Sequence, residues 1–298
     1  MKRRMLGMVL GLCALPAQAA VNVFACEPEW AALVAELGGE QVSVYAATTA
    51  RQDPHHIEAR PSLIAKLRRA DMLVCTGAEL EAGWLPVLLR QSGNSRVQPG
   101  RPGHFMAAEQ VERLEVPAVA DRALGDLHMD GNPHVHTDPR RLLRIAEALG
   151  ERLAAVDGAN GDHYRARLAE FRARWQQAMA QWQRTAAPLR GVHVVSHHQD
   201  WVYLYDWLGL VEAARLEPKP GIPPSAAHLS SLTATLKDQP AGMVLRTPFQ
   251  DARPAEWLAT RTGMQVVVLP YTVGGSAAAG DLFALFDETV ARLLEAAP

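Results

Sequence analysis

Short apolar runs alternate with amphipathic segments along the chain, and this alternation predicts its secondary structure. Runs typical of buried strands occupy residues 21–26, 42–47, 71–76, 192–196, 242–247 and 265–269. Segments with helical periodicity lie near residues 28–38, 61–69, 79–91, 139–154, 161–186, 204–209, 226–237, 254–262 and 281–296. Because strands and helices alternate, we expect an α/β fold in which parallel sheets are flanked by helices.

The strands fall into two groups, separated by a long helical segment without a strand. Large apolar residues recur there at steps of three or four positions, at Tyr164, Leu168, Phe171, Trp175, Met179 and Trp182. One apolar stripe along a helix of this length indicates packing against both halves of the chain rather than a cofactor site. We therefore predict an N-terminal lobe at 20–158, a connecting backbone helix at 159–188 and a C-terminal lobe at 189–298.

The N-terminal residues 1–19 have the pattern of a secretory signal peptide. Three basic residues precede an apolar run at 5–16, and residues 17–19 supply a small-x-small cleavage site. The apolar run is shorter than the roughly 20 residues that span a bilayer. We expect cleavage before Ala20 and export to the periplasm. The alternatives are a retained membrane anchor and a lipid anchor at Cys13.

Composition and charge narrow the class of protein. Hydrophobic residues make up 48% of the chain and charged residues 21%, which is typical of globular proteins. Removing residues 1–19 takes away three basic residues and no acidic residue, so the formal net charge changes from −2 to −5. A chain with this charge has no basic surface of the kind that binds nucleic acid.

Two cysteines, Cys26 and Cys75, remain in the exported chain, and each ends a short apolar run. An oxidising compartment permits a disulfide between them. Two buried free thiols fit the same pattern, and the two alternatives stay open. A cysteine metal site is not expected, because the chain has no CxxC pair.

Histidines gather in three loop-like segments, at residues 52–58, 128–138 and 196–201. The first and third follow predicted strands, and ligands of α/β folds bind beyond the carboxyl ends of strands. Imidazole nitrogen is a preferred ligand of zinc. Because adjacent residues point in different directions, we expect one histidine from each segment to bind a zinc ion between the lobes.

A zinc-dependent periplasmic hydrolase is the main alternative to a binding protein. A zinc protease is expected to carry an HExxH motif, and the segment from His55 to Glu58 is too short to form one. The GxSxG motif of serine hydrolases is also absent from the sequence. We therefore expect no enzyme. A passive zinc store or an adhesin on the same scaffold is a further alternative.

Four segments resemble motifs of a known family. They are Asp53–Ser62, Ala70–Glu81, Asn132–Pro139 and His198–Tyr203. Together they make the exported chain similar, over essentially its whole length, to the metal-binding proteins of zinc and manganese ABC importers, whose two lobes are joined by one long helix. The resemblance implies a high-affinity periplasmic zinc-binding protein that delivers Zn²⁺ to the permease of an ABC importer.

The same resemblance implies three metal ligands, His55, His134 and His198. His55 directly follows a proline, and His134 lies in a Pro-His-x-x-x-Asp-Pro motif. At the third position the manganese members typically have a carboxylate, so His198 favours zinc, because imidazole suits zinc better than manganese.

The fourth ligand departs from the family pattern. Many relatives have an aspartate just after the final strand, but residues 269–272 contain no carboxylate here. We nominate Glu217, which lies in a segment similar to the family's Glu-x-x-x-Gly loop. Asp281 and a water molecule are the alternatives, and the roles of His128 and His136 stay open. A periplasmic zinc chaperone is a further candidate partner, and we expect a monomer.

Overall fold

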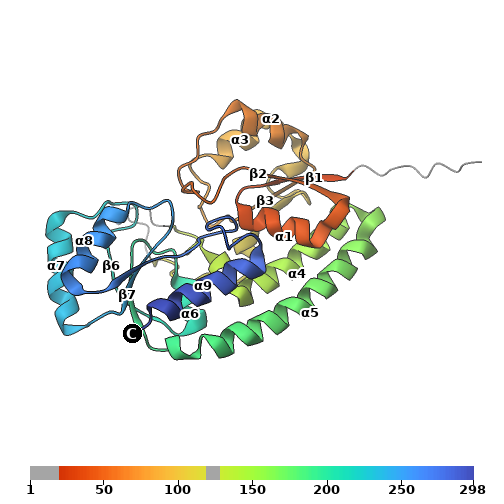
Figure 1. The fold of residues 1–298 in the computed structure, drawn as a ribbon. Helices are drawn as coiled ribbons and strands as arrows, with labels where there is room; N and C mark the ends of the chain where they lie inside the picture. The colour runs from red at the N-terminus through yellow and green to blue at the C-terminus, as the bar shows by residue number, and fades with distance from the viewer. Residues whose placement is uncertain (1–19, 119–127) are drawn as a thin grey trace, which may run out of the picture.

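The computed structural model describes residues 20–118 and 128–298, which form two lobes lying side by side (Figure 1). Each lobe contains one four-stranded parallel sheet, so the predicted α/β class is confirmed. The predicted signal peptide lies outside the described residues. Within the described ranges, no helix has both the length and the apolar character needed to cross a membrane.

The N-terminal lobe is built on a sheet with the strand order β2-β1-β3-β4. Its strands are β1 (Val21–Ala25), β2 (Val42–Ala46), β3 (Met72–Cys75) and β4 (His104–Met106), and its helices are α1 (Pro28–Gly38), α2 (Pro61–Arg69) and α3 (Leu85–Ser92). Helix α1 covers one face of the sheet, while α2 and α3 cover the other (Figure 1). The central strands β1 and β3 are therefore covered on both faces, which explains why β3 is apolar throughout and β1 is apolar except at the exposed Asn22.

The C-terminal lobe repeats this arrangement with the strand order β6-β5-β7-β8. Its strands are β5 (His193–Ser196), β6 (Val211–Arg215), β7 (Met243–Arg246) and β8 (Gln265–Val268), and its helices are α6 (Val202–Leu208), α7 (Ala226–Asp238), α8 (Ala252–Thr262) and α9 (Leu282–Ala296). Helices α7 and α8 pack on one face through residues such as Leu229 and Leu258. Because parallel strands share one direction, the loops after β5 and β7 leave the same edge of the sheet.

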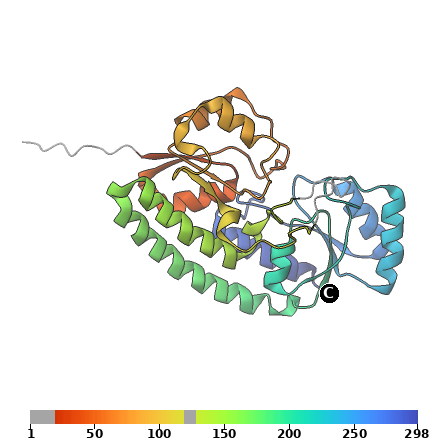
Figure 2. The same cartoon turned by 180° about the vertical axis from the view of Figure 1, so that it is seen from behind.

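Two long helices, α4 (Pro139–Val156) and α5 (Gly161–Thr185), pack against each other and run beneath both lobes (Figure 2). The aromatic residues of the predicted stripe are buried on α5. Trp175 donates its indole N–H to the Pro139 carbonyl at 2.9 Å, and Trp182 donates to Asp287 of α9 at 2.6 Å. Helix α5 also contacts α1. The prediction that this stripe packs against both lobes is confirmed.

Three elements differ from the sequence-based expectations. The helix expected over 79–91 begins only at α3, because Ala78 and Glu79 have positive φ angles of 46° and 65°, which no helix accommodates. Strand β4 was not predicted from the sequence, and it is only three residues long. Strand β6 lies at a sheet edge and carries Glu212 and Arg215, so its sequence lacks the apolar run that marks a buried strand.

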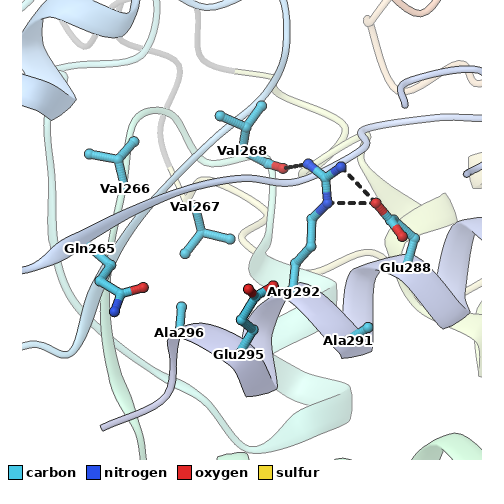
Figure 3. Close-up of a pocket in the computed structure, with 9 residues that line it drawn as sticks. All are labelled: Gln265, Val266, Val267, Val268, Glu288, Ala291, Arg292, Glu295 and Ala296. Carbon is cyan, nitrogen blue, oxygen red and sulfur yellow. Dashed lines mark hydrogen bonds and ion pairs between the residues drawn. The ribbon is translucent and has the colours of Figure 1, made fainter. Parts of the chain in front are cut away.

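A hollow of about 540 Å³ lies between β8 and α9 (Figure 3). Arg292 lines it, donates to the Val268 carbonyl at 2.5 Å and pairs with Glu288 at 2.6 Å. The guanidinium group of Arg292 is thus already paired. None of the nine residues that line the hollow is a histidine. This hollow offers no counterpart to the predicted zinc site.

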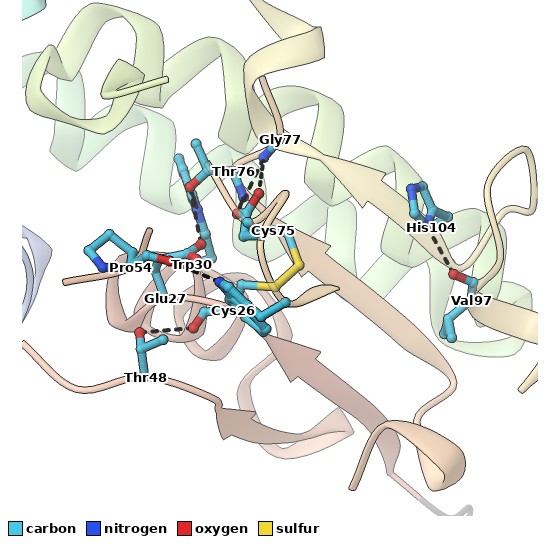
Figure 4. Close-up of a disulfide and its surroundings, with 12 residues drawn as sticks. Cys26, Glu27, Trp30, Thr48, Pro54, Cys75, Thr76, Gly77, Val97 and His104 are labelled. Atoms are coloured by element: carbon cyan, nitrogen blue, oxygen red, sulfur yellow. Dashed lines mark hydrogen bonds between the residues drawn. A yellow bond between two sulfur atoms is a disulfide. The ribbon is translucent and has the colours of Figure 1, made fainter. Parts of the chain in front are cut away.

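A disulfide joins Cys26 and Cys75 at the carboxyl ends of the neighbouring strands β1 and β3 (Figure 4). Their Cα atoms are 4.8 Å apart, within the range that a disulfide spans. Both residues are fully buried. Of the two alternatives left open by the sequence, the structure therefore has the disulfide.

Two buried glutamates, Glu27 and Glu81, lie beside this disulfide. Glu81 accepts hydrogen bonds from the backbone N–H of Thr76 at 2.7 Å and of Gly77 at 3.0 Å. Burial raises the pKa of Glu81 to about 7. Burial, followed by the charge of Glu81, raises the pKa of Glu27 well above its ordinary value. The pair therefore keeps a proton at pH values where exposed carboxyl groups have lost theirs.

The free energy of unfolding is expected to fall as the pH rises towards neutrality. Unfolded glutamates lose their protons near pH ~4.3, whereas folded Glu81 does so at about 7. Between these values the folded state binds more protons, so stability decreases by up to about 1.4 kcal/mol per pH unit for each proton. Urea unfolding across this range should show a flatter pH dependence in the Glu27→Gln variant. An unchanged slope would contradict the conclusion that Glu27 and Glu81 together retain a proton in the folded chain.

Candidate metal centre

Three histidines from separate segments meet where the two lobes face each other. His55 lies in the loop after β2, His134 in the segment before α4, and His198 in the loop after β5. Their ring centroids are 5.6 to 5.7 Å apart. One ring nitrogen of each lies within 4.8 Å of those of the other two. The fold thus brings together the three histidines that the sequence nominates as ligands.

His55 is held by its own loop. The Asp53 carboxylate accepts the backbone N–H of His55 at 3.0 Å and contacts its Nδ1 at 2.7 Å. The Pro54 carbonyl accepts the indole N–H of Trp84 at 2.9 Å, which ties the loop to the lobe. Although burial opposes it, the hydrogen bond with His55 lowers the pKa of Asp53. The carboxylate therefore stays charged and fixes the proton of His55 on Nδ1.

His134 is completely buried. Its backbone N–H donates to the Asn132 side chain at 3.0 Å, and its Nδ1 contacts the Tyr271 hydroxyl at 2.6 Å. Among the residues that the structure describes, none is a hydrogen-bond partner of its Nε2. Burial, and after it the neighbouring imidazoles, place the pKa of His134 well below the ordinary value. The ring is therefore neutral, which is the form that binds a metal.

His198 has a comparable arrangement with a carboxylate. Its Nδ1 lies 2.7 Å from Oε2 of Glu217, and its buried Nε2 has no hydrogen-bond partner within residues 20–118 and 128–298. Glu217 also accepts the backbone N–H of Gly221 at 3.0 Å, which closes the loop over the site. Burial acts to lower the pKa of His198, but Glu217 and Asp200 raise it overall. Of the two buried rings, His198 is the one that takes up a proton first as the pH falls.

The three rings share one chemical pattern. In each ring Nδ1 lies within hydrogen-bonding distance of an oxygen atom, which belongs to Asp53, Tyr271 or Glu217. For His55 and His198 the partner is a carboxylate, which only accepts, so the neutral ring carries its proton on Nδ1 and a lone pair on Nε2. The Tyr271 hydroxyl can either accept from or donate to Nδ1 of His134. Metal-binding histidines are usually oriented by such a partner on the opposite nitrogen. Two buried, unpaired Nε2 atoms would be costly without a ligand, so the donor set fits a zinc ion.

The cavity beside these rings is small. It measures about 50 Å³ and is lined by His55, His198, Asp200 and Gln250, among others. Pockets for organic ligands are usually about 300–1,000 Å³. The available space therefore suits a metal ion and not the substrate of a hydrolase.

Neither candidate for the fourth ligand lies beside the Nε2 atoms. Glu217 contacts the opposite nitrogen of His198, so it stands behind that ring. Asp281 is exposed and caps α9, where its carboxylate accepts the backbone N–H of Ala284 at 2.8 Å. The contact that the structure gives Asp281 is thus that of a helix cap.

Sequence reasoning missed Tyr271, which follows β8. Its carbonyl accepts Nε2 of His136 at 2.9 Å, while its hydroxyl contacts His134. The next residue, Thr272, donates its hydroxyl to buried Glu29 of α1 at 2.5 Å. This strand end therefore connects the C-terminal lobe both to the metal centre and to the N-terminal lobe.

Two parallel-sheet lobes on a long helix, with imidazoles from both lobes directed at one point, define a metal-binding protein of the substrate-binding class. The family model described as ZnuA, zinc-uptake complex component A, periplasmic, matches residues 23–296, and the chain belongs to this family.

Comparisons with individual proteins agree with this membership. The chain is 24% identical over 225 residues to the high-affinity zinc uptake system protein ZnuA of Yersinia pestis, covering 72% of this chain and 70% of the relative. A crystal structure of ZnuA superposes with a TM-score of 0.78 at 24% identity, covering 94% of this chain and all of the other. A deletion mutant of ZnuA with zinc bound has a TM-score of 0.75 at 25% identity, covering 93% and 96%.

The family defines the class of function. The chain is a zinc-binding component of a metal ABC importer, zinc is its transported ligand, and it is not an enzyme. It acts on the extracellular side of the membrane, and an importer of this kind implies a permease and an ATPase as partners. The predicted transport function is therefore confirmed over the hydrolase and the passive store.

Proposed function

We propose that one Zn²⁺ ion binds between the lobes through the Nε2 atoms of His55, His134 and His198 and is delivered from there to the permease. One observation supports this ligand set above all. Each Nδ1 contacts an oxygen atom, and the buried Nε2 atoms of His134 and His198 have no partner in the described part of the chain.

In this proposal Glu217 orients His198 and strengthens it as a ligand. A carboxylate on the far nitrogen of a histidine fixes the tautomer and raises the basicity of the nitrogen that binds the metal. The direct ligation that the sequence indicated for Glu217 would require it to leave both His198 and Gly221. The contacts therefore favour the orienting role.

The proposal also covers the processing of the chain, its oligomeric state and its partners. Residues 1–19 act as a signal peptide that is removed before Ala20. The exported chain works as a monomer with lobes at 20–158 and 189–298 joined by the helix at 159–188. A periplasmic zinc chaperone is a candidate donor of the ion, and the permease receives it.

A zinc titration of the exported chain tests the ligand set. Tight binding is expected to saturate at one equivalent of Zn²⁺, measured by competition with a chromogenic chelator. The Glu217→Gln variant keeps an acceptor oxygen for His198, so a loss of about tenfold in affinity is expected, while Glu217→Ala should cost up to about 100-fold.

Two outcomes of this titration would count against the proposal. A stoichiometry different from one would reject a single centre. If Glu217→Gln removed tight binding as completely as the loss of a histidine ligand, Glu217 would itself bind the metal. The exposed residue His193, in β5, provides a matched control, and His193→Ala is expected to bind zinc like the unmodified protein.

A further inference from the structure

A fourth histidine, His128, lies against the proposed centre. It is buried, with 6% of its surface exposed. Its Nε2 is 3.2 Å from the Nε2 of His55, and the two ring centroids are 5.2 Å apart. His128 therefore borders the proposed centre through its contact with His55.

The backbone around His128 is firmly held. Its carbonyl accepts the N–H of Gly131 at 3.1 Å, and the N–H of Met129 donates to Glu79. Gly131 has a φ of +96°, and a Cβ atom there would lie 2.9 Å from Arg113. Only glycine fits this turn without strain. The turn thus sets the position from which the His128 side chain reaches the centre.

The contact between the two Nε2 atoms needs an atom between them. Because Nδ1 of His55 faces the Asp53 carboxylate, the Nε2 of His55 carries a lone pair. Two facing lone pairs repel each other, so either a proton of His128 or a shared cation separates them. Two nitrogens bound to one tetrahedral zinc at about 2.0–2.1 Å lie about 3.3 Å apart. The observed separation of 3.2 Å matches that geometry.

We propose that His128 is the fourth protein ligand of the zinc ion, which makes the centre a set of four imidazole nitrogens. This inference rests on the proposed function of His55, His134 and His198. His128 is not a member of the group whose ligand atoms all lie within 4.8 Å of one another, so its ring turns inward when the ion binds. A set of four nitrogens favours zinc over manganese and needs no carboxylate after β8.

Cobalt absorption spectra and zinc affinities of the exported chain, residues 20–298, test this proposal. The variants are His128→Ala and His128→Gln, with His193→Ala as the matched control for an exposed histidine. Both His128 variants should bind one equivalent of Zn²⁺ more weakly by at least about 100-fold, because His128 is proposed to contact the ion itself and loss of a residue that only orients a ligand costs about 10- to 100-fold. Their visible Co²⁺ bands should shift and weaken, because water replaces an imidazole. The control should reproduce the affinity and spectrum of the unmodified chain.

Two results would overturn the proposal. If the His128 variants kept the unmodified affinity and Co²⁺ spectrum, His128 would not be a ligand. If they bound zinc more tightly, His128 would instead block the centre through its hydrogen bond to His55. Circular dichroism of the metal-free variants checks that they fold. The His134→Ala variant separates the two proposals, because its tight binding disappears if the three-histidine centre is correct, whatever His128 does.

Discussion

Replacing His134 by alanine is expected to lower the affinity for Zn²⁺ by more than about 100-fold. Loss of a residue that only orients a ligand typically costs about 10- to 100-fold, and His134 is proposed to contact the ion itself. It is fully buried between the lobes, so water does not readily take its place. The variant also leaves the Tyr271 hydroxyl without its partner.

Competition titration with a chromogenic chelator measures this loss. His163→Gln is a suitable control, because His163 is an ordered histidine of α5 that contacts the Gly38 carbonyl at 3.0 Å and lies outside the centre. The control should bind zinc with unchanged affinity. Tight one-equivalent binding by His134→Ala would remove the basis of the proposed centre.

Removing the disulfide is expected to lower the free energy of unfolding by about 4 kcal/mol. Its two cysteines are 49 residues apart in sequence, and the entropy of closing a loop of this length in the unfolded chain corresponds to roughly that value. The double variant Cys26→Ala with Cys75→Ala tests it, because alanine leaves no polar atom in the buried site.

Urea unfolding of the oxidised chain and of the double variant measures the difference in stability. Dithiothreitol should lower the stability of the unmodified chain and leave that of the double variant unchanged. Zinc stoichiometry should stay at one equivalent in the folded variant, because neither cysteine contacts the three histidines. Equal unfolding midpoints for the two proteins would show that the cross-link contributes nothing.

Apolar periodicity predicted the central strands and the long helix because these elements bury whole runs of side chains. The run at 71–76 became β3, and the stripe that includes Trp175 and Trp182 became the buried face of α5. Strand β6 was not predicted, because an edge strand with Glu212 and Arg215 has no continuous apolar run. Local pattern thus identifies elements of the core better than elements at a sheet edge.

The site was predictable in part for a related reason. His55, His134 and His198 lie in short motifs that can be read locally. The partners of their Nδ1 atoms depend on segments that meet only in the folded chain, such as Tyr271, which is 137 residues from His134. Glu217 was nominated as a metal ligand, and the sequence does not reveal that it faces Nδ1 of His198.

Tyr271 contacts both the proposed metal centre and the N-terminal lobe. Its hydroxyl forms a hydrogen bond with His134, and its carbonyl accepts one from His136. The neighbouring Thr272 donates to Glu29 and so also connects the lobes. A membrane partner that levers the lobes apart would pull on this same strand end. The hydroxyl would then withdraw from His134, and the imidazole would become a weaker donor to the ion. Separation of the lobes at this strand end would therefore weaken the proposed ligation by His134.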